Sequence, residues 1–138
     1  MLIAALALAT DSDDVVGVWL NQKEDGLIRI ERVGAHYRGT IVGAPEGTRK
    51  DPNVRDVMNQ DPELRDRKLV GLVMMGGYTF DAKASWLGGW IYDPDVGKQY
   101  KAKMTLTGPD TLEIRGYIGV PILGRTEVWT RWTKSPES

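Results

Sequence analysis

The feature that most constrains the fold is a succession of short apolar or alternating segments, each ended by residues typical of turns. Asp25-Gly26 and the stretch Asp93–Gly97 favour tight connections between antiparallel strands. From Gln99 to Thr107, apolar residues alternate with lysine and threonine, as in a strand with one buried face. The pattern predicts about eight strands, at residues 15–20, 27–33, 36–42, 69–75, 86–92, 99–107, 111–118 and 123–133, with Gly76-Gly77 as the turn after the fourth.

Strands joined by tight turns are antiparallel neighbours, and eight of them can close into a barrel without exposed edges. A length of 138 residues fits one domain with one core. We therefore expect an all-β fold, an antiparallel up-and-down β-barrel of about eight strands, formed by residues 10–134 and followed by a tail at 135–138. The interior of such a barrel holds either its own side chains or one small ligand.

One long segment, residues 45–68, interrupts the series of strands. It holds three prolines, six acidic and six basic residues, so no strand fits there. Asp61, Pro62 and Glu63 are typical of a helix start, which predicts a partly helical insertion. Long connections in compact domains are often lids, and we expect this one to cover one end of the barrel. Its charged and amide side chains are expected to form helix caps and ion pairs with the barrel rim, chiefly Asp56, Asn59, Asp61, Arg65 and Arg67.

The first residues differ in character from the rest. Leu2–Ala9 is an apolar run that ends in the small-x-small pattern Ala7-Leu8-Ala9, as at a signal-peptide cleavage site. We expect residues 1–9 to be a signal-peptide remnant and the protein to be periplasmic or secreted by a bacterium. The alternative is an apolar helix or strand of the domain itself. Neither this run nor any other is long enough to span a membrane as a helix, so we expect a protein that is not membrane-spanning.

Composition excludes several classes of function. With 18 basic and 19 acidic residues, the chain lacks the positive field that nucleic-acid binding requires. It has no cysteine and one histidine, His36, so it has no disulfide, no thiolate site and no multi-histidine metal site. No nucleophile motif accompanies His36, and Asp93 and Asp95 are interpreted as turn residues. We expect neither an enzyme nor a bound metal or cofactor.

Two long segments, Trp86–Tyr100 and Leu112–Thr126, resemble the exported bacterial family known as domain of unknown function 2147. Gly17-Val18-Trp19, the stretch Asn59–Arg67 and Trp129-Thr130-Arg131 share the resemblance, which covers residues 15–133. Lys68 departs from it, since the family often has proline there.

Gly17-x-Trp19 is also similar to the opening signature of lipocalins and fatty-acid-binding proteins. This resemblance implies a calycin-like barrel whose base is closed by an arginine packed over the tryptophan ring. Arg131 is the first candidate for that arginine and Arg125 the second. Trp19 and Arg131 are therefore the expected structural barrel base.

The candidate ligand-binding residues are aromatic or basic side chains of the second half of the chain. They predict an aromatic pocket with an arginine as polar handle. The alternative for the aromatic residues is core packing. Strict alternation places Arg125, Glu127, Trp129 and Arg131 on one face, either as an internal anion site or, as charges on strands usually do, toward water. The candidates are Trp90, Tyr92, Tyr100, Arg115, Tyr117 and Arg125.

Two functions follow from these features. The first is an exported barrel that binds a small apolar or amphipathic ligand. The second is a barrel filled by its own side chains, which acts through its surface as a cell-envelope or host-interaction module. Large alternating residues on 99–107 favour filling, whereas glycines on or beside the strands favour internal space, at Gly39, Gly88, Gly89 and Gly116.

Overall fold

The computed structural model describes residues 10–48 and 51–134. The predicted signal segment, 1–9, and the predicted tail, 135–138, lie outside the described residues. The described chain contains eight strands and two single-turn 3-10 helices, η1 and η2. Their bounds are β1 Gly17–Leu20, β2 Leu27–Val33, β3 His36–Gly43, η1 Pro62–Leu64, β4 Val73–Asp81, β5 Ser85–Asp93, β6 Lys98–Gly108, β7 Thr111–Tyr117, η2 Pro121–Leu123 and β8 Gly124–Arg131.

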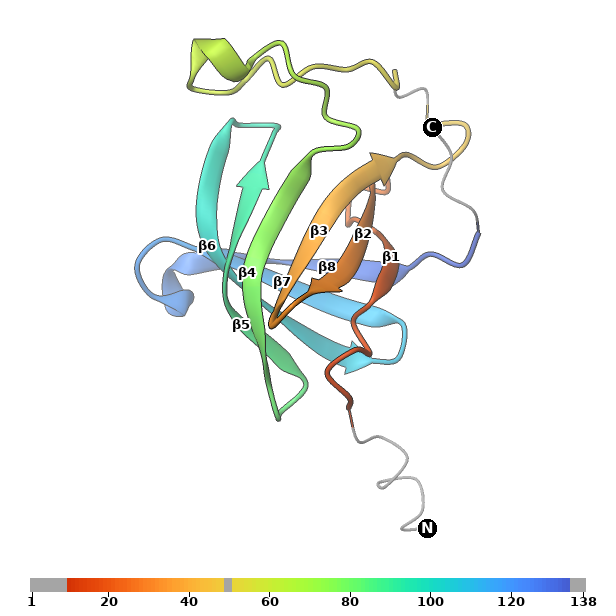
Figure 1. Ribbon diagram of the computed structural model, residues 1–138, viewed down its shortest axis with the longest axis vertical. Coiled ribbons are helices and arrows are strands. Elements are labelled where there is room, and N and C mark those ends of the chain that lie inside the picture. The colour runs from red at the N-terminus through yellow and green to blue at the C-terminus, as the bar shows by residue number, and fades with distance from the viewer. Residues whose placement is uncertain (1–9, 49–50, 135–138) are drawn as a thin grey trace.

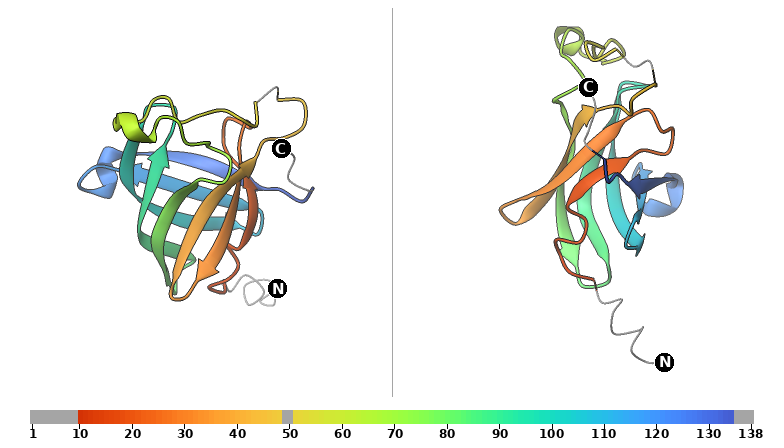
Figure 2. Two further views of the ribbon diagram at one scale, coloured as in Figure 1. Left: turned by 45° about the horizontal axis from the view of Figure 1, so that its top comes forward. Right: turned by 90° about the vertical axis from the view of Figure 1, so that its right-hand side faces the viewer.

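Each strand pairs antiparallel with the next, and β8 pairs with β1 to close the barrel. This confirms the predicted all-β, antiparallel up-and-down barrel of eight strands (Figure 1). Because successive strands alternate in direction, the connections β1–β2, β3–β4, β5–β6 and β7–β8 gather at one end, here called the open end. The segment between β3 and β4 crosses that end, and the chain before β1 lies at the opposite, closed end (Figure 2).

The predicted turn at Gly76-Gly77 is wrong, because both glycines lie inside β4 and the turn follows at residues 82–84. Gly76 pairs with Trp90 of β5, and a Cβ at Gly76 would come within 3.2 Å of the Trp90 ring. Gly76 thus makes room for the Trp90 indole on the surface of the sheet. From the sequence alone, the same glycine pair indicates a turn.

The closed half of the barrel is filled by large side chains. Trp19, Trp86, Tyr78 and Met75 are among those buried there. Two of the glycines of the inner face belong to this packing: a Cβ at Gly39 would overlap Met75, and a Cβ at Gly89 would overlap the Tyr78 ring. These glycines therefore accommodate neighbouring side chains and leave no empty space.

The base of the barrel is held by Arg131 and Trp19, which are register partners on β8 and β1. The Trp19 Nε1 donates to the carbonyl of Val15 at 2.9 Å, and the Arg131 guanidinium lies over the indole. Arg131 also donates to the carbonyl oxygens of Asp14 at 2.7 Å and Val16 at 3.0 Å. A single arginine thus joins the last strand to the chain segment that precedes the first.

The insertion contains less helix than its sequence suggests. Asp61 caps η1 as expected, its Oδ1 accepting from the Glu63 backbone N–H at 3.0 Å, but the helix ends after one turn. The β5–β6 turn packs directly against the insertion. At Gly97, with φ +71°, a Cβ would overlap the carbonyl oxygen of Met58. Within the described residues, no helix has the length and apolar character needed to cross a membrane.

Candidate functional site

A cavity of about 610 Å³ occupies the open half of the barrel. This volume lies within the range of small-molecule sites, about 300–1,000 Å³. Its inner wall is apolar, whereas its mouth is made of polar loops and part of the insertion, including Asp51, Pro52 and Val54. The apolar wall includes Ile28, Ile41, Met74, Ile91, Ile114 and Trp129.

Gly116 on β7 contributes to the size of this cavity. It lines the space, and a Cβ there would meet Ile91 and Tyr100 only at ordinary contact distances of 3.7 and 3.8 Å. Unlike Gly39 and Gly89, it is not overlain by a packed side chain. The barrel is therefore filled at its closed end and hollow at its open end.

Four of the six predicted ligand-binding residues line the cavity: Tyr92, Tyr100, Tyr117 and Arg125. Trp90 does not. A bulge at Gly88, with φ +75°, shifts the alternation of β5, so that Trp86 and Gly89 face inward while Trp90 lies against Gly76 and Gly77.

Arg115 does not line the cavity either. It donates to the carbonyl oxygens of Pro121 at 2.8 Å and Ile122 at 3.3 Å, and to the Thr126 hydroxyl at 2.9 Å. These contacts hold the β7–β8 connection against the barrel. Arg115 therefore helps to position the loop beside the mouth, and its guanidinium does not point into the cavity.

The charged residues of β8 do face inward, contrary to the outer-face interpretation that the sequence favours. Arg125, Glu127 and Trp129 all line the cavity. The Arg125 Nη2 lies 3.4 Å from a carboxylate oxygen of Glu127 and 3.8 Å from one of Asp93. Its side chain is nevertheless 75% exposed, so the guanidinium stands at the mouth between two carboxylates.

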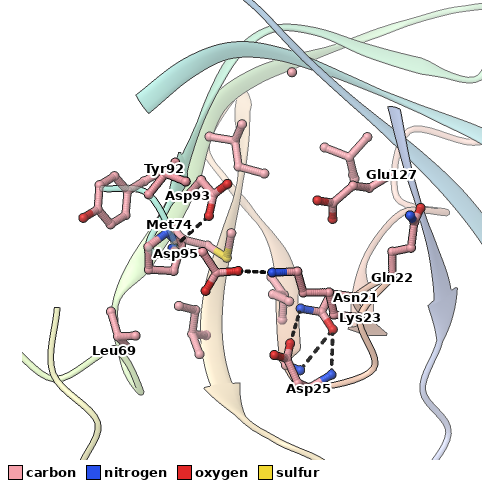
Figure 3. A pocket seen from close by; sticks show the side chains of 18 of the residues that line it. Asn21, Gln22, Lys23, Asp25, Leu69, Met74, Tyr92, Asp93, Asp95 and Glu127 are labelled. Carbon is pink, nitrogen blue, oxygen red and sulfur yellow. Dashed lines mark hydrogen bonds and ion pairs between the residues drawn. The ribbon is translucent and has the colours of Figure 1, made fainter. Parts of the chain in front are cut away.

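A second ion pair crosses the mouth. Lys23 of the β1–β2 connection binds Asp95 of the β5–β6 turn, as Figure 3 shows. The hydrogen bond and charge of Asp95 raise the pKa of Lys23 above its ordinary value. Beside it, the Asn21 amide N–H donates to Asp25 at 2.9 Å, and its oxygen accepts from the Asp25 backbone N–H at 3.0 Å.

A buried polar cluster, here called the latch, attaches the insertion to the barrel. Asp56 is fully buried, and its carboxylate accepts from the Tyr92 hydroxyl at 2.6 Å, the Asn59 amide at 2.8 Å and Arg67 Nε at 2.9 Å. Burial favours a higher pKa for Asp56, but these hydrogen bonds outweigh it and hold the pKa below its ordinary value. Burial and the bond to Asp56 raise the pKa of Tyr92 to about 12.

Sequence reasoning missed most of the mouth. It did not identify Lys23 or Asp95 as cavity residues, it placed Glu127 in the interior only as one of two alternatives, and it assigned no apolar wall. The up-and-down topology could have identified the loops of the mouth, because it brings every connection from an odd-numbered strand to the next even-numbered strand to the same end of the barrel. Within residues 10–48 and 51–134, no group of three or more histidine, aspartate or glutamate side chains is placed to hold a metal ion.

The model of one protein family, described as "Uncharacterized protein conserved in bacteria (DUF2147)", matches residues 17–131. The chain belongs to the DUF2147 family. No curated protein matches its sequence. The DUF2147 chain is similar to the solved structure of HP1028 from the human pathogen Helicobacter pylori, described as belonging to the lipocalin family. The TM-score is 0.76 at 20% sequence identity, over 86% of this chain and 83% of that chain.

At this identity the likeness shows the fold alone. The DUF2147 chain thus has a lipocalin-like barrel, which agrees with the calycin-like features of its sequence.

Proposed function

We propose that this DUF2147 protein binds a small apolar or amphipathic molecule inside its barrel. The observation that carries the proposal is the cavity of about 610 Å³, apolar within and polar at its mouth. Apolar contact contributes about 0.8 kcal/mol per buried methylene, offset by the cost of association. A single alkyl chain is therefore expected to bind with micromolar affinity.

The alternative, a filled barrel acting through its surface, describes the closed half of the molecule well. It does not account for the open half, where Gly116 leaves space and isoleucines line it. The cavity therefore favours the binding function. The insertion serves in this proposal as a cover, and its described residues Asp51, Pro52 and Val54 form part of the wall.

Binding is tested with the neutral dye N-phenyl-1-naphthylamine, whose fluorescence rises in apolar surroundings. Wild-type protein is expected to bind it, and Gly116→Leu is expected to abolish binding because the new side chain projects into the cavity. Gly108→Leu is the matched control, since Gly108 lies outside the cavity with no atom near its Cβ position. Absence of dye binding by the wild type, or equal binding by both variants, would contradict the proposal.

Export is part of the same proposal, supported by the apolar run Leu2–Ala9 and its small-x-small ending. N-terminal sequencing of the protein from the bacterium that produces it is expected to show cleavage after Ala9. A mature chain that begins at Met1 would contradict export through this signal.

A further inference from the structure

We propose that the cavity selects apolar molecules with a cationic polar end, and that Glu127 binds that end. This inference rests on the proposed binding function and specifies the class of its ligand. It differs from the expectation drawn from the sequence, in which an arginine holds the carboxylate of a fatty acid.

The charges that line the cavity support this choice. Among the described residues that line the cavity, seven are charged, five of them acidic and two basic. The acidic residues come from four separate parts of the chain that the barrel topology brings together. They are Asp25, Asp51, Asp93, Asp95 and Glu127.

Within the described part of the chain, both basic residues that line the cavity have carboxylate partners. Lys23 is bound to Asp95, and Arg125 stands between Glu127 and Asp93. A ligand carboxylate that approaches Arg125 would also face the carboxylates of Glu127 and Asp93. Like charges at such distances repel, so an anionic end is disfavoured.

The position of Glu127 allows its carboxylate to bind a cation inside the cavity. It lies on the inner face of β8 between exposed Arg125 and buried Trp129, and Figure 3 shows its side chain in the cavity, across from Asp93 and Asp95. Its pairing partner on β7, Ile114, is buried in the core. An apolar tail can therefore lie on the inner wall while the charged end reaches this carboxylate.

The existing partners of Glu127 leave it capacity to accept. Trp129 Nε1 donates to its Oε1 at 3.1 Å, and Arg125 approaches its Oε2 at 3.4 Å. The second distance is long for a charge-assisted hydrogen bond, which is usually about 2.7–2.9 Å. An ionised carboxylate offers about four acceptor positions, so a ligand cation can bind there without breaking the Trp129 contact. Tyr100, which also lines the cavity, adds an aromatic surface that attracts cations.

The test compares three probes with one tail: dodecylammonium, which is protonated at neutral pH, dodecanol and dodecanoate. Each displaces N-phenyl-1-naphthylamine at neutral pH, below its micelle concentration, at low and at high salt. We expect the cation to bind about tenfold more tightly than the carboxylate, the effect of one charged contact. The alcohol is expected between them, and high salt is expected to reduce the difference.

Two variants of β8 should shift this preference in opposite directions. Glu127→Gln is expected to remove most of it, whereas Arg125→Gln is expected to strengthen cation binding, because it frees both carboxylates. Glu31→Gln is the matched control. It makes the same chemical change at a carboxylate that pairs with Arg38 and does not line the cavity.

The outcomes separate this inference from the proposed function. Equal affinity for the three probes, or tighter binding of dodecanoate, would overturn the cationic selection while leaving cavity binding intact. Loss of dodecanoate binding in Arg125→Gln would instead assign Arg125 as an anion handle and overturn the role of Glu127. If neither the dye nor any probe binds, the proposed function itself fails and the selection fails with it.

Discussion

The guanidinium carbon of Arg131 lies 4.3 Å from the centre of the Trp19 ring, where β8 closes onto β1. The same guanidinium donates to backbone carbonyls before β1 and in the β6–β7 turn, at Val16 and Pro109. It therefore links three parts of the chain that are distant in sequence. At the closed end, the Arg131 side chain therefore makes both the contact with the Trp19 ring and the hydrogen bonds to the backbone carbonyls.

Replacing Arg131 by Ala is expected to destabilise the barrel. The change removes several charge-assisted hydrogen bonds and the ring contact, and we expect a loss of about 2–3 kcal/mol in the free energy of unfolding. Urea denaturation monitored by tryptophan fluorescence measures it. Arg38→Ala serves as control, because its exposed pair with Glu31 is worth less than about 1 kcal/mol. An equal loss of unfolding free energy in both variants would show that Arg131 stabilises the barrel no more than an exposed ion pair does.

The latch gives a second prediction. Tyr92→Phe removes the hydroxyl that donates to Asp56 and leaves a buried carboxylate with one partner fewer. We expect a cost of about 1–3 kcal/mol, confined to the attachment of the insertion. Hydrogen exchange should accelerate in residues 51–68, while amides of β6 and β7 keep their protection. Unchanged exchange in the insertion would argue that the hydroxyl contributes nothing to its position.

The two latch pKa values predict how this attachment depends on pH. Tyr92 has a raised pKa, so its stabilising proton is fully present below the ordinary tyrosine value of about 10 and is lost as pH rises toward about 12. Asp56 has a lowered pKa, so its contribution is present above its ordinary value and is lost as pH falls through the lowered one. Limited proteolysis of the insertion should be slow between these limits and accelerate beyond each. Tyr92→Phe should lack the alkaline acceleration.

Substitution of two exposed apolar side chains at the mouth is expected to lower the affinity for ligand without changing the stability of the protein. Ile118 and Leu123 line the cavity although each is 69% exposed. Replacing either by Ser is expected to weaken binding of N-phenyl-1-naphthylamine several-fold, since the ligand would cover part of that surface. Thermal unfolding should change little, because exposed positions seldom exceed about 0.5 kcal/mol.

The neighbouring Ile122 provides the control for this prediction. It is 81% exposed in the same connection but does not line the cavity. Ile122→Ser should leave dye affinity unchanged. A loss of affinity equal to that of the other two variants would mean that general hydrophobicity of the loop, and not contact with the ligand, governs binding.

The strands of the barrel and their order could be predicted from the sequence, but few of the residues of its interior could. Alternation along 99–107 and the turn signals were sufficient for strand number and order, because these are local properties. Alternation also placed Arg125, Glu127 and Trp129 on one face of β8. It could not say which face, since that depends on whether the barrel has a cavity in which charges stay hydrated.

Glycine explains the remaining differences. At Gly88 a positive φ changes the face on which Trp90 lies, and at Gly76 a missing side chain accommodates its ring. Both effects depend on contacts between neighbouring strands, which single-sequence patterns do not contain. The sequence grouped Asp56 with Asn59 and Arg67, which do bind it. It could not identify the third partner, Tyr92, because that residue is 36 positions away in the chain.

Removal of the insertion tests its role as a cover. Replacing residues 46–66 by a short Gly-Ser linker deletes Asp51, Pro52 and Val54 from the cavity wall, together with Asp56 of the latch. The strands contribute all eight ladders without it, so β-sheet circular dichroism should persist. Affinity for N-phenyl-1-naphthylamine should fall, because the ligand then contacts water on the side where the insertion lay. Retained affinity with an intact circular dichroism spectrum would show that the barrel alone forms the site and that the insertion serves another purpose.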